Sequence, residues 1–166
     1  MLKAIIIGCP GSGKSTFANK LRNITKLPLY HLDMIWHKED RTTITKEEFD
    51  VKLSNLLEKD RWIIDGNYQR TLEMRLKECD TVFLMDYPLD ICIAGVKSRV
   101  GHKHDDLPWI EDNLDSEFKE KIVNFSKDKL PKIYDLLEKY KDRNIIIFHA
   151  REEADKYLKK LEKGGV

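Results

Sequence analysis

The chain has 166 residues, of which 41% are hydrophobic and 36% are charged, and its formal net charge is +1. This length indicates one compact domain over residues 1–166, large enough to form a core without metal or disulfide crosslinks. The balance of 30 basic against 29 acidic residues excludes the strongly basic surface that a non-specific nucleic-acid or anionic-membrane binder needs.

The apolar stretches and the cysteines indicate the compartment. The longest apolar stretches, such as Ala4–Ile7 and Ile145–Phe148, have the length of a strand and fall short of the ~20 residues of a membrane span. The start of the chain, Met1–Lys3, lacks the apolar segment and cleavage site of a signal peptide. The three cysteines are widely spaced and odd in number, which fits free thiols. We expect a cytoplasmic protein without a membrane segment.

Short β-branched runs alternate with longer segments of helical period along the chain. This pattern is typical of an α/β protein, in which helices cover both faces of a parallel sheet. The expected strands are Leu2–Ile7, Leu29–Leu32, Trp62–Ile64, Thr81–Met85 and Ile145–Phe148. Several of these runs are apolar throughout, as strands that are buried on both faces must be.

Helices are expected between these strands. They begin at Lys14–Ser15 and after the capping box Thr45–Glu48, and cover Leu72–Lys77, Leu89–Val100, about Ser116–Tyr140 and Glu152–Leu161. In the capping box, a threonine and a glutamate three residues later satisfy free backbone groups of the first turn. Pro131 is expected to kink or divide the long helix, because proline removes a backbone donor and crowds the preceding turn.

Two irregular stretches, Met34–Thr43 and Gly101–Asn113, are predicted to lie at the same edge of the sheet. Loops of this length in a compact domain are often lids or binding segments. We therefore assign an acceptor-binding segment to about residues 33–60 and a lid to about residues 99–115. Trp36 and Trp109, one in each stretch, either stack on a ring-bearing ligand or pack on the core.

A glycine-rich motif follows the first strand. The run Gly8–Ser15 reads Gly-Cys-Pro-Gly-Ser-Gly-Lys-Ser and satisfies the phosphate-loop pattern of Gly, four residues and Gly-Lys-Ser/Thr. Backbone N–H groups of such a loop converge with a helix N-terminus on the β-phosphate of a nucleotide. The candidate nucleotide-binding residues are Gly8, Pro10, Gly11, Ser12, Gly13, Lys14, Ser15 and Thr16. The alternative is a glycine-rich turn that only joins the strand to the helix.

Within this motif, two side chains have predicted roles in phosphoryl transfer. Lys14 is expected between the β- and γ-phosphates of a nucleoside triphosphate, and the Ser15 hydroxyl is expected to coordinate Mg²⁺. Kinases, GTPases and mechanical ATPases share this loop, so the reaction has to be inferred from other residues.

Aspartates follow three of the predicted strands, where ligands of open α/β sheets bind. Asp65 ends a strand that should neighbour the phosphate loop, so we favour it for Mg²⁺; a turn or cap role in Asp65-Gly66 is the alternative. Asp33 is a candidate to orient a phosphoryl acceptor or to take its proton, with structural capping as the alternative. Asp86 precedes Tyr-Pro and is expected to cap the following helix.

The predicted lid carries cations and histidines. Arg99 and Lys103 are candidates to stabilise charge on the transferred phosphoryl group, and a closing lid would exclude water. An ordinary solvated connection is the alternative. His102 and His104 are two residues apart, so both could reach one metal ion in an extended segment, but no cysteine or further histidine is close in the sequence.

The strings Gly8–Ser15, Trp62–Tyr68 and Val82–Pro88 resemble the adenylate-kinase-like P-loop kinases. The narrower strings His31–Asp33 and Ile64–Tyr68 look most like the bacterial family of DNA topology modulation proteins, FlaR-related. The resemblance covers nearly the whole chain. It implies a three-layer α/β/α fold with a five-stranded parallel sheet of order 2-3-1-4-5, and a short acceptor-binding region after the second strand.

The resemblance also implies a mobile lid that begins near a phosphate-clamping arginine, here Arg99. Adenylate kinases supply several arginines from lid and core, whereas this chain has none between Arg99 and Arg143. The arginine that holds a monophosphate in those enzymes could correspond to Arg70 or Arg75, but neither lies at their spacing. The resemblance therefore does not extend to a phosphate-bearing acceptor.

Together these features predict a Mg²⁺-dependent phosphotransferase that moves the γ-phosphoryl group of ATP, or alternatively GTP, to a small-molecule acceptor. Lys14, Asp33 and Arg99 are the catalytic candidates, and Ser15 and Asp65 are the metal candidates. One alternative is a regulatory nucleotide-binding protein or ATPase that acts through a partner. Another is a direct modulator of DNA topology, although the sequence has no helix-turn-helix or basic tail.

Overall fold

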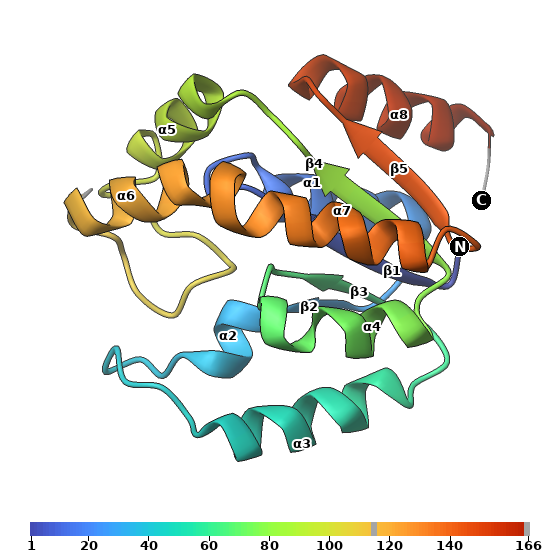
Figure 1. Ribbon diagram of the computed structural model, residues 1–166, viewed down its shortest axis with the longest axis horizontal. Helices are drawn as coiled ribbons and strands as arrows, with labels where there is room; N and C mark the ends of the chain where they lie inside the picture. The colour runs from blue at the N-terminus through green and yellow to red at the C-terminus, as the bar shows by residue number, and fades with distance from the viewer. Residues whose placement is uncertain (114–115, 165–166) are drawn as a thin grey trace.

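The computed structural model describes residues 1–113 and 116–164. Its centre is a five-stranded, wholly parallel sheet of order β2-β3-β1-β4-β5 (Figure 1), which confirms the predicted strand order. The strands are β1 (Lys3–Gly8), β2 (Leu29–His31), β3 (Trp62–Asp65), β4 (Thr81–Met85) and β5 (Asn144–Phe148). All five lie within one or two residues of their predicted positions, because their apolar runs are bounded by polar residues.

Helices cover both faces of the sheet and give the predicted three-layer architecture (Figure 1). The helical elements are α1 (Lys14–Thr25), α2 (Leu32–Trp36), α3 (Lys46–Leu57), η1 (Gln69–Thr71), α4 (Leu72–Glu78), α5 (Leu89–Lys97), α6 (Ser116–Asn124), η2 (Phe125–Lys129), α7 (Leu130–Lys139) and α8 (Arg151–Gly164). Helices α1 and α8 pack against each other on one face, and α4 and α7 cross the other (Figure 1).

Local sequence signals account for several element boundaries. At the start of α3, the Thr45 hydroxyl accepts a hydrogen bond from the Glu48 amide, and the Glu48 carboxylate accepts one from the Thr45 amide. This is the predicted capping box. The long C-terminal helical segment is divided, with the π turn η2 before α7, and Pro131 lies in the first turn of α7, where a missing N–H costs little.

Two expectations about local structure were wrong. The stretch 34–43 is not wholly irregular, because α2 begins at Leu32 directly after β2 and an isolated bridge then pairs His37 with Thr43. Asp86 does not cap α5, because Pro88 occupies the N-cap position and no side chain bonds there. The Asp86 carboxylate instead accepts a 2.6 Å hydrogen bond from the Tyr134 hydroxyl of α7.

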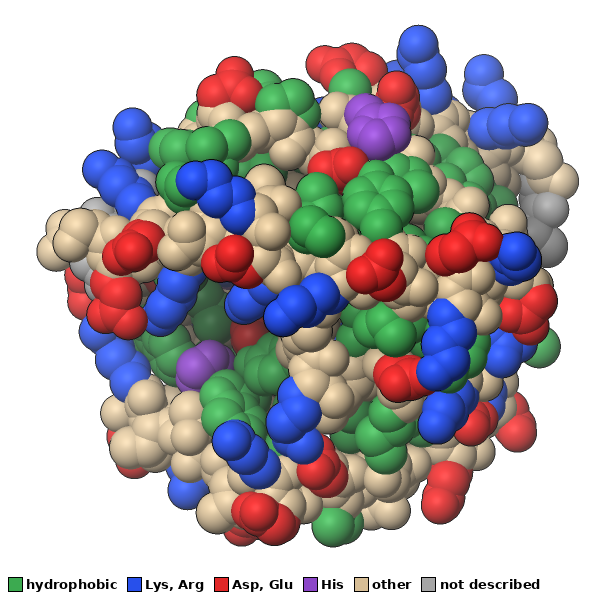
Figure 2. Space-filling model, viewed as in Figure 1, with side chains coloured by type: hydrophobic (Ala, Val, Ile, Leu, Met, Phe, Trp, Pro, Cys, Tyr) green, Lys and Arg blue, Asp and Glu red, His purple; other side chains and the backbone are tan. Residues whose placement is uncertain are grey.

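The core is continuous across both faces of the sheet. Residues Ala4–Ile7 of β1 have no exposed surface, and Trp62 at the start of β3 is equally buried. On the outside, basic and acidic side chains are interspersed (Figure 2), in keeping with the near-zero net charge. Among the helices of the described residues, none is long and apolar enough to cross a membrane.

Arg75 of α4 is fully buried and anchors the loop that follows β3. Its guanidinium donates hydrogen bonds to the backbone carbonyls of Gly66, Asn67, Tyr68 and Thr71. Burial lowers the pKa of this guanidinium to about 10, so it stays charged at neutral pH. The arginine thus satisfies carbonyls that the loop itself leaves without donors.

We expect Arg75→Met to lower the free energy of unfolding by about 3–5 kcal/mol, because several buried carbonyls lose their donor. The matched control is Arg70→Met, since the Arg70 side chain is 47% exposed and pairs with Asp50 at the surface. That change should cost about 1 kcal/mol or less. Urea unfolding measures both, and equal losses would contradict the anchoring role.

Candidate functional site

The phosphate-loop motif joins the end of β1 at Gly8 to the start of α1 at Lys14. Gly13 is the N-cap residue of α1 with φ 90°, a left-handed conformation in which a side chain would be strained. Within the described residues, no side chain caps this helix terminus. Its free backbone amide groups can therefore bind an anion.

Helices α5 and α8 hold the loop from outside. A Cβ atom added to Gly95 of α5 would lie 1.9 Å from the carbonyl oxygen of Gly11, so only glycine permits this approach. Arg151, at the start of α8, donates a 3.2 Å hydrogen bond to the same carbonyl. The ammonium group of Lys14 donates to the Cys9 carbonyl at 3.0 Å, which places it over the loop. The loop is thus preformed by its neighbours.

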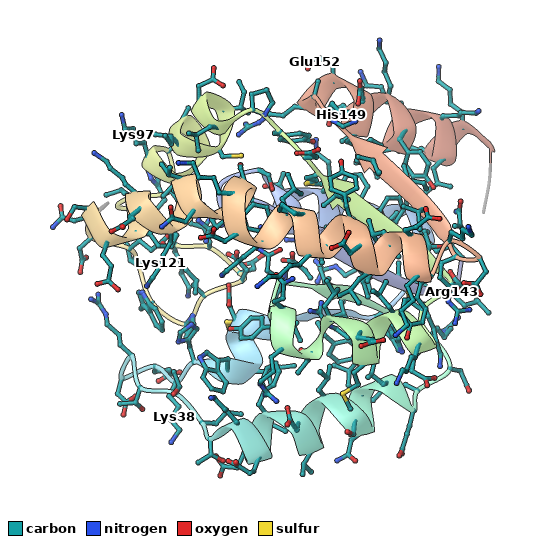
Figure 3. All side chains as sticks on the ribbon, in the orientation of Figure 1. Lys38, Lys97, Lys121, Arg143, His149 and Glu152 are labelled. Atoms are coloured by element: carbon teal, nitrogen blue, oxygen red, sulfur yellow. The ribbon has the colours of Figure 1, made fainter. Side chains whose placement is uncertain are left out.

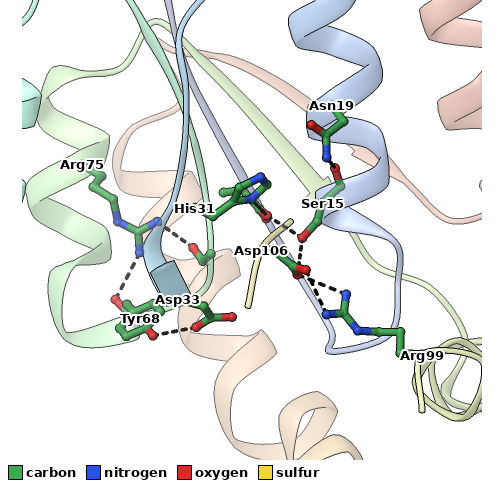
Figure 4. Close-up of polar contacts among 10 residues, drawn as sticks. Ser15, Asn19, His31, Asp33, Tyr68, Arg75, Arg99 and Asp106 are labelled. Atoms are coloured by element: carbon green, nitrogen blue, oxygen red, sulfur yellow. Dashed lines mark hydrogen bonds and ion pairs between the residues drawn. The ribbon is translucent and has the colours of Figure 1, made fainter. Parts of the chain in front are cut away.

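A cluster of oxygens lies beside the loop (Figure 4). The Ser15 hydroxyl is 2.7 Å from Oδ2 of Asp65 and 2.7 Å from Oδ2 of Asp106. The ring Nδ1 of His31, at the end of β2, lies 2.8 Å from the same Asp65 oxygen. Asp65 comes from the end of β3 and Asp106 from the lid, so three separate segments meet at Ser15.

The geometry of this cluster fits a divalent cation. A hydroxyl has one proton, so Ser15 can donate to only one of the two carboxylates that lie 2.7 Å away. Mg²⁺ binds oxygens at 2.0–2.1 Å in octahedral geometry, which sets neighbouring ligand oxygens about 2.9 Å apart, close to these separations. In the described part of the chain, Oδ1 of Asp65 is buried and has no hydrogen-bond partner. The residues present therefore suit Mg²⁺.

In the predicted lid, residues 99–113 of the described chain, Asp106 contacts Ser15, and Arg99 pairs with carboxylates of the same segment. Its guanidinium bonds both oxygens of Asp106 at 2.9 and 3.1 Å, and its Nε donates to Glu111 at 3.1 Å. Burial acts to raise the pKa of Asp106, but the hydrogen bonds and charge of Arg99 hold it below the usual range of an aspartate. Asp106 is thus a carboxylate. Residues 114–115 of the predicted lid lie outside the described residues.

One cavity of about 640 Å³ connects the phosphate loop with the lid and α2. Of the predicted site residues, it brings together Pro10, Gly11, Gly13, Lys14, Ser15, Thr16, Asp33, Asp65 and Arg99. Gly8 and Ser12 are not among its lining residues. Gly8 donates its amide to Asn67 instead, and Ser12 faces a smaller cavity of about 150 Å³ between α1 and α8.

The far end of the cavity is aromatic. Tyr68 donates a 2.6 Å hydrogen bond to Asp33, and burial raises the pKa of this aspartate. Trp109 lines the cavity, and its ring packs edge-on against the ring of His37, with 4.9 Å between the ring centroids. Trp36 instead packs edge-on against the buried Phe49. Of the two roles considered for Trp36, the structure therefore supports packing on the core. Figure 2 shows a hollow between the lid and α2, with a histidine and hydrophobic side chains on its floor.

Sequence reasoning missed several residues of this cavity: His31, His37, Asp106, Lys121, Lys129 and Arg151 all line it. The sequence prediction considers only aspartates at the carboxyl ends of strands. The same reasoning also points to His31, the last residue of β2, and to Arg151, shortly after β5. Figure 3 places Lys121 on the side of α6 that faces the lid. No local signal distinguishes Asp106 from its acidic neighbours.

Several residues that the sequence suggested for binding phosphate or metal do not line the cavity. Lys103 is absent from its lining, and both Arg70 and Arg75 are engaged elsewhere. Within residues 1–113 and 116–164, no group of three or more His, Cys, Asp or Glu side chains could hold a metal, so His102 and His104 gain no support as a metal pair. A Mg²⁺ ion beside Ser15 would depend on its hydroxyl and, in a nucleotide complex, on phosphate oxygens.

Comparison with known sequences gives a partial match. No protein-family model matches the chain. The adenylate kinases of Thermotoga petrophila and Thermotoga maritima are each 29% identical to it over 99 residues, which is 57% of this chain and 43% of theirs. The chain thus spans less than half the length of these curated relatives.

Solved structures match over almost the whole chain. An unliganded sugar kinase from Janibacter sp. has a TM-score of 0.53 at 14% identity, covering 97% of this chain and 90% of its own. Shikimate kinase from Bacteroides thetaiotaomicron has a TM-score of 0.59 at 14% identity, with coverages of 98% and 97%. Shikimate kinase from Acinetobacter baumannii, in complex with shikimate, has a TM-score of 0.60 at 17% identity, with coverages of 99% and 95%. The chain therefore shares its fold with these sugar and shikimate kinases.

The close approach of α5 to the phosphate loop leads to a prediction. Gly95→Ala should push the Gly11 carbonyl outward and weaken Mg·ATP binding by about tenfold or more, which corresponds to ~1.4 kcal/mol. Gly164→Ala is the control, because a Cβ there meets nothing within 4 Å. Isothermal titration calorimetry of the two folded variants makes the comparison; equal affinities would show that the loop tolerates displacement.

Proposed function

We propose that the protein is a kinase that transfers the γ-phosphoryl group of ATP to a hydroxyl group of a small molecule. The observation that carries the proposal is the single cavity that contains Lys14 and Ser15 at one end and Asp33 at the other. A hydrolase needs only the first end. The partial match to adenylate kinases and the fold shared with shikimate and sugar kinases support the same reaction type.

On the donor side, the free amides of the loop and the N-terminus of α1 receive the phosphates. Lys14, which now bonds the Cys9 carbonyl, is close enough to move onto them. Ser15, Asp65 and Asp106 would hold Mg²⁺, which neutralises phosphate charge in such sites. The buried, unpartnered Oδ1 of Asp65 supports this assignment.

On the acceptor side, Asp33 would orient the attacking hydroxyl and take its proton. Its raised pKa makes the carboxylate a stronger base than an exposed aspartate. The lid contacts the acceptor-binding segment, because the Trp109 ring lies against His37. Closure of this segment over a bound acceptor would exclude water, which favours transfer to an acceptor over hydrolysis.

The regulatory ATPase and the direct modulator of DNA topology remain alternatives to this proposal. The first requires ATP turnover that no small acceptor stimulates. The second requires a DNA affinity that falls steeply as salt rises. The interspersed surface charges visible in Figure 2 give no continuous basic patch on that face, so we do not favour DNA binding.

Lys14→Ala tests the donor site. Loss of the ammonium group should leave the fold intact and weaken Mg·ATP binding by at least about 100-fold, because in the proposed function this group contacts the β- and γ-phosphates. Lys52→Ala, on the exposed side of α3, is the control and should bind normally. Calorimetry with circular dichroism as a folding check gives the answer, and undiminished affinity in folded Lys14→Ala would refute nucleotide binding at this loop.

Asp106→Asn tests the metal assignment without requiring turnover. If the lid carboxylate holds Mg²⁺, the Mg²⁺ concentration needed for half-maximal tightening of ATP binding should rise about tenfold. Affinity for ATP without Mg²⁺ should not fall. Asp105→Asn is the matched control, since Asp105 is the exposed neighbour. Tighter Mg·ATP binding by Asp106→Asn would instead show that the Asp106 side chain occupies the nucleotide position and has to move before nucleotide binds.

A further inference from the structure

We define the acceptor half of the cavity by five of its lining residues, Asp33, His37, Tyr68, His104 and Trp109. It contains a carboxylate, a phenol, two imidazoles and an indole, and none of these residues is a lysine or an arginine. An acceptor that carries a phosphate or a carboxylate needs a cation at its binding site. The question is whether any arginine or lysine nearby is free to serve.

The nearby arginines are engaged outside the cavity. Arg70 forms a bidentate pair with Asp50 at 2.7 and 2.9 Å on the surface. Arg75 is buried among backbone carbonyls, and Arg41 pairs with Asp112 at 2.8 Å. None of the three arginines lines the cavity within the part of the chain that the structure describes. Arg70 and Arg75, the two arginines considered from the sequence for binding an acceptor phosphate, are therefore not available for that role.

Within the part of the chain that the structure describes, five lysines and arginines line the cavity: Lys14, Arg99, Lys121, Lys129 and Arg151. Lys14 and Arg151 both donate to carbonyls of the phosphate loop. Arg99 bonds two carboxylates, those of Asp106 and Glu111. Lys121 and Lys129 are exposed and come from α6 and η2, and α6 contacts the phosphate loop where Cys9 meets the Ile122 carbonyl. The hydrogen-bond partner of Asp33 is instead the hydroxyl of Tyr68.

The acceptor half instead offers groups that recognise hydroxyls. Nδ1 of His37 and Nε2 of His104 are buried and have no hydrogen-bond partner among the described residues. Burial lowers the pKa of His37, so its ring is neutral at neutral pH and can donate or accept a hydrogen bond. The ring of Trp109 supplies a flat apolar surface beside them.

We propose that the acceptor is an uncharged ring compound with neighbouring hydroxyl groups, a free sugar or a nucleoside, and not a phosphate ester or a carboxylic acid. The proposal rests on the kinase function proposed above. An anion beside Asp33 would meet the negative charge of that carboxylate, whereas a hydroxyl group can form a hydrogen bond with it.

The transfer step balances with the groups present. An acceptor hydroxyl oxygen forms a bond to the γ-phosphorus of ATP as the bond from that phosphorus to the β,γ-bridging oxygen breaks. ADP leaves with the bridging oxygen and its electron pair. The hydroxyl proton passes to the carboxylate of Asp33, which later releases it to solvent. Tyr68, which bonds Asp33 at 2.6 Å, holds that carboxylate in position.

The test is a set of matched acceptor pairs incubated with the wild-type protein and Mg·ATP and followed by ³¹P spectroscopy. The pairs are adenosine and AMP, cytidine and CMP, glucose and glucose 6-phosphate, and shikimate methyl ester and shikimate. We expect the uncharged member of at least one pair to be phosphorylated with a kcat/KM at least about 30-fold above its anion. Preference for adenosine or cytidine would identify a nucleoside acceptor, and preference for glucose a sugar.

Two outcomes contradict the proposals in different ways. If the anion of a pair is used as well as or better than its uncharged partner, the acceptor class is wrong and the kinase function stands. If no compound is phosphorylated and none stimulates ATP consumption, the kinase function fails and the acceptor class fails with it.

Variants of the acceptor half give a second readout. His37→Lys adds a cation there and should narrow the discrimination against the anion by about tenfold, whereas His102→Lys, on the exposed part of the lid, should not. Asp33→Asn should lower kcat at least about 100-fold with little change in acceptor KM, and Asp135→Asn on the exposed side of α7 should change neither. An unchanged preference in folded His37→Lys would contradict the placement of the acceptor.

Discussion

The parallel pairing of β3 with both β1 and β2 is the constraint on which the site depends. Asp65 lies opposite Ile6 of β1 and opposite His31 of β2, so the carboxyl ends of all three strands meet at one edge of the sheet. The phosphate loop continues from β1 at this edge, which is why Ser15 reaches Asp65 at 2.7 Å. A shift of β3 by one residue would turn Asp65 to the opposite face of the sheet and separate the two groups.

The lid completes an arrangement that the sheet edge begins. Asp106 places a second carboxylate on Ser15, and Arg99 compensates its charge while remaining bonded to Glu111. The same contacts engage Arg99 with two carboxylates of the predicted lid. In the proposed function, the cations of the phosphate loop serve the donor phosphates, and Asp33, His37 and Trp109 contact the acceptor.

Sequence reasoning was accurate where the signal is local or periodic. The capping box at Thr45 and the division of the last long helix near Pro131 were both predicted, because each depends on a few consecutive residues. The same reasoning was wrong at Asp86, which bonds Tyr134, 48 residues away, instead of capping α5. It also could not show that Arg75 is buried, because charged residues are normally exposed and only the packed loop after β3 reveals its carbonyl partners.

The sequence by itself determined the phosphate loop, the alternation of strands and helices and hence the three-layer class. Those features arise from glycine positions, polar boundaries and hydrophobic period within short windows. Only the tertiary structure decided which charges are free. Asp106 meets Ser15 across 91 residues and Arg70 pairs with Asp50 across 20, and no short-range pattern specifies such pairs. Where each cation finds its partner depends on packing, and this distribution is what sets the proposed choice of acceptor.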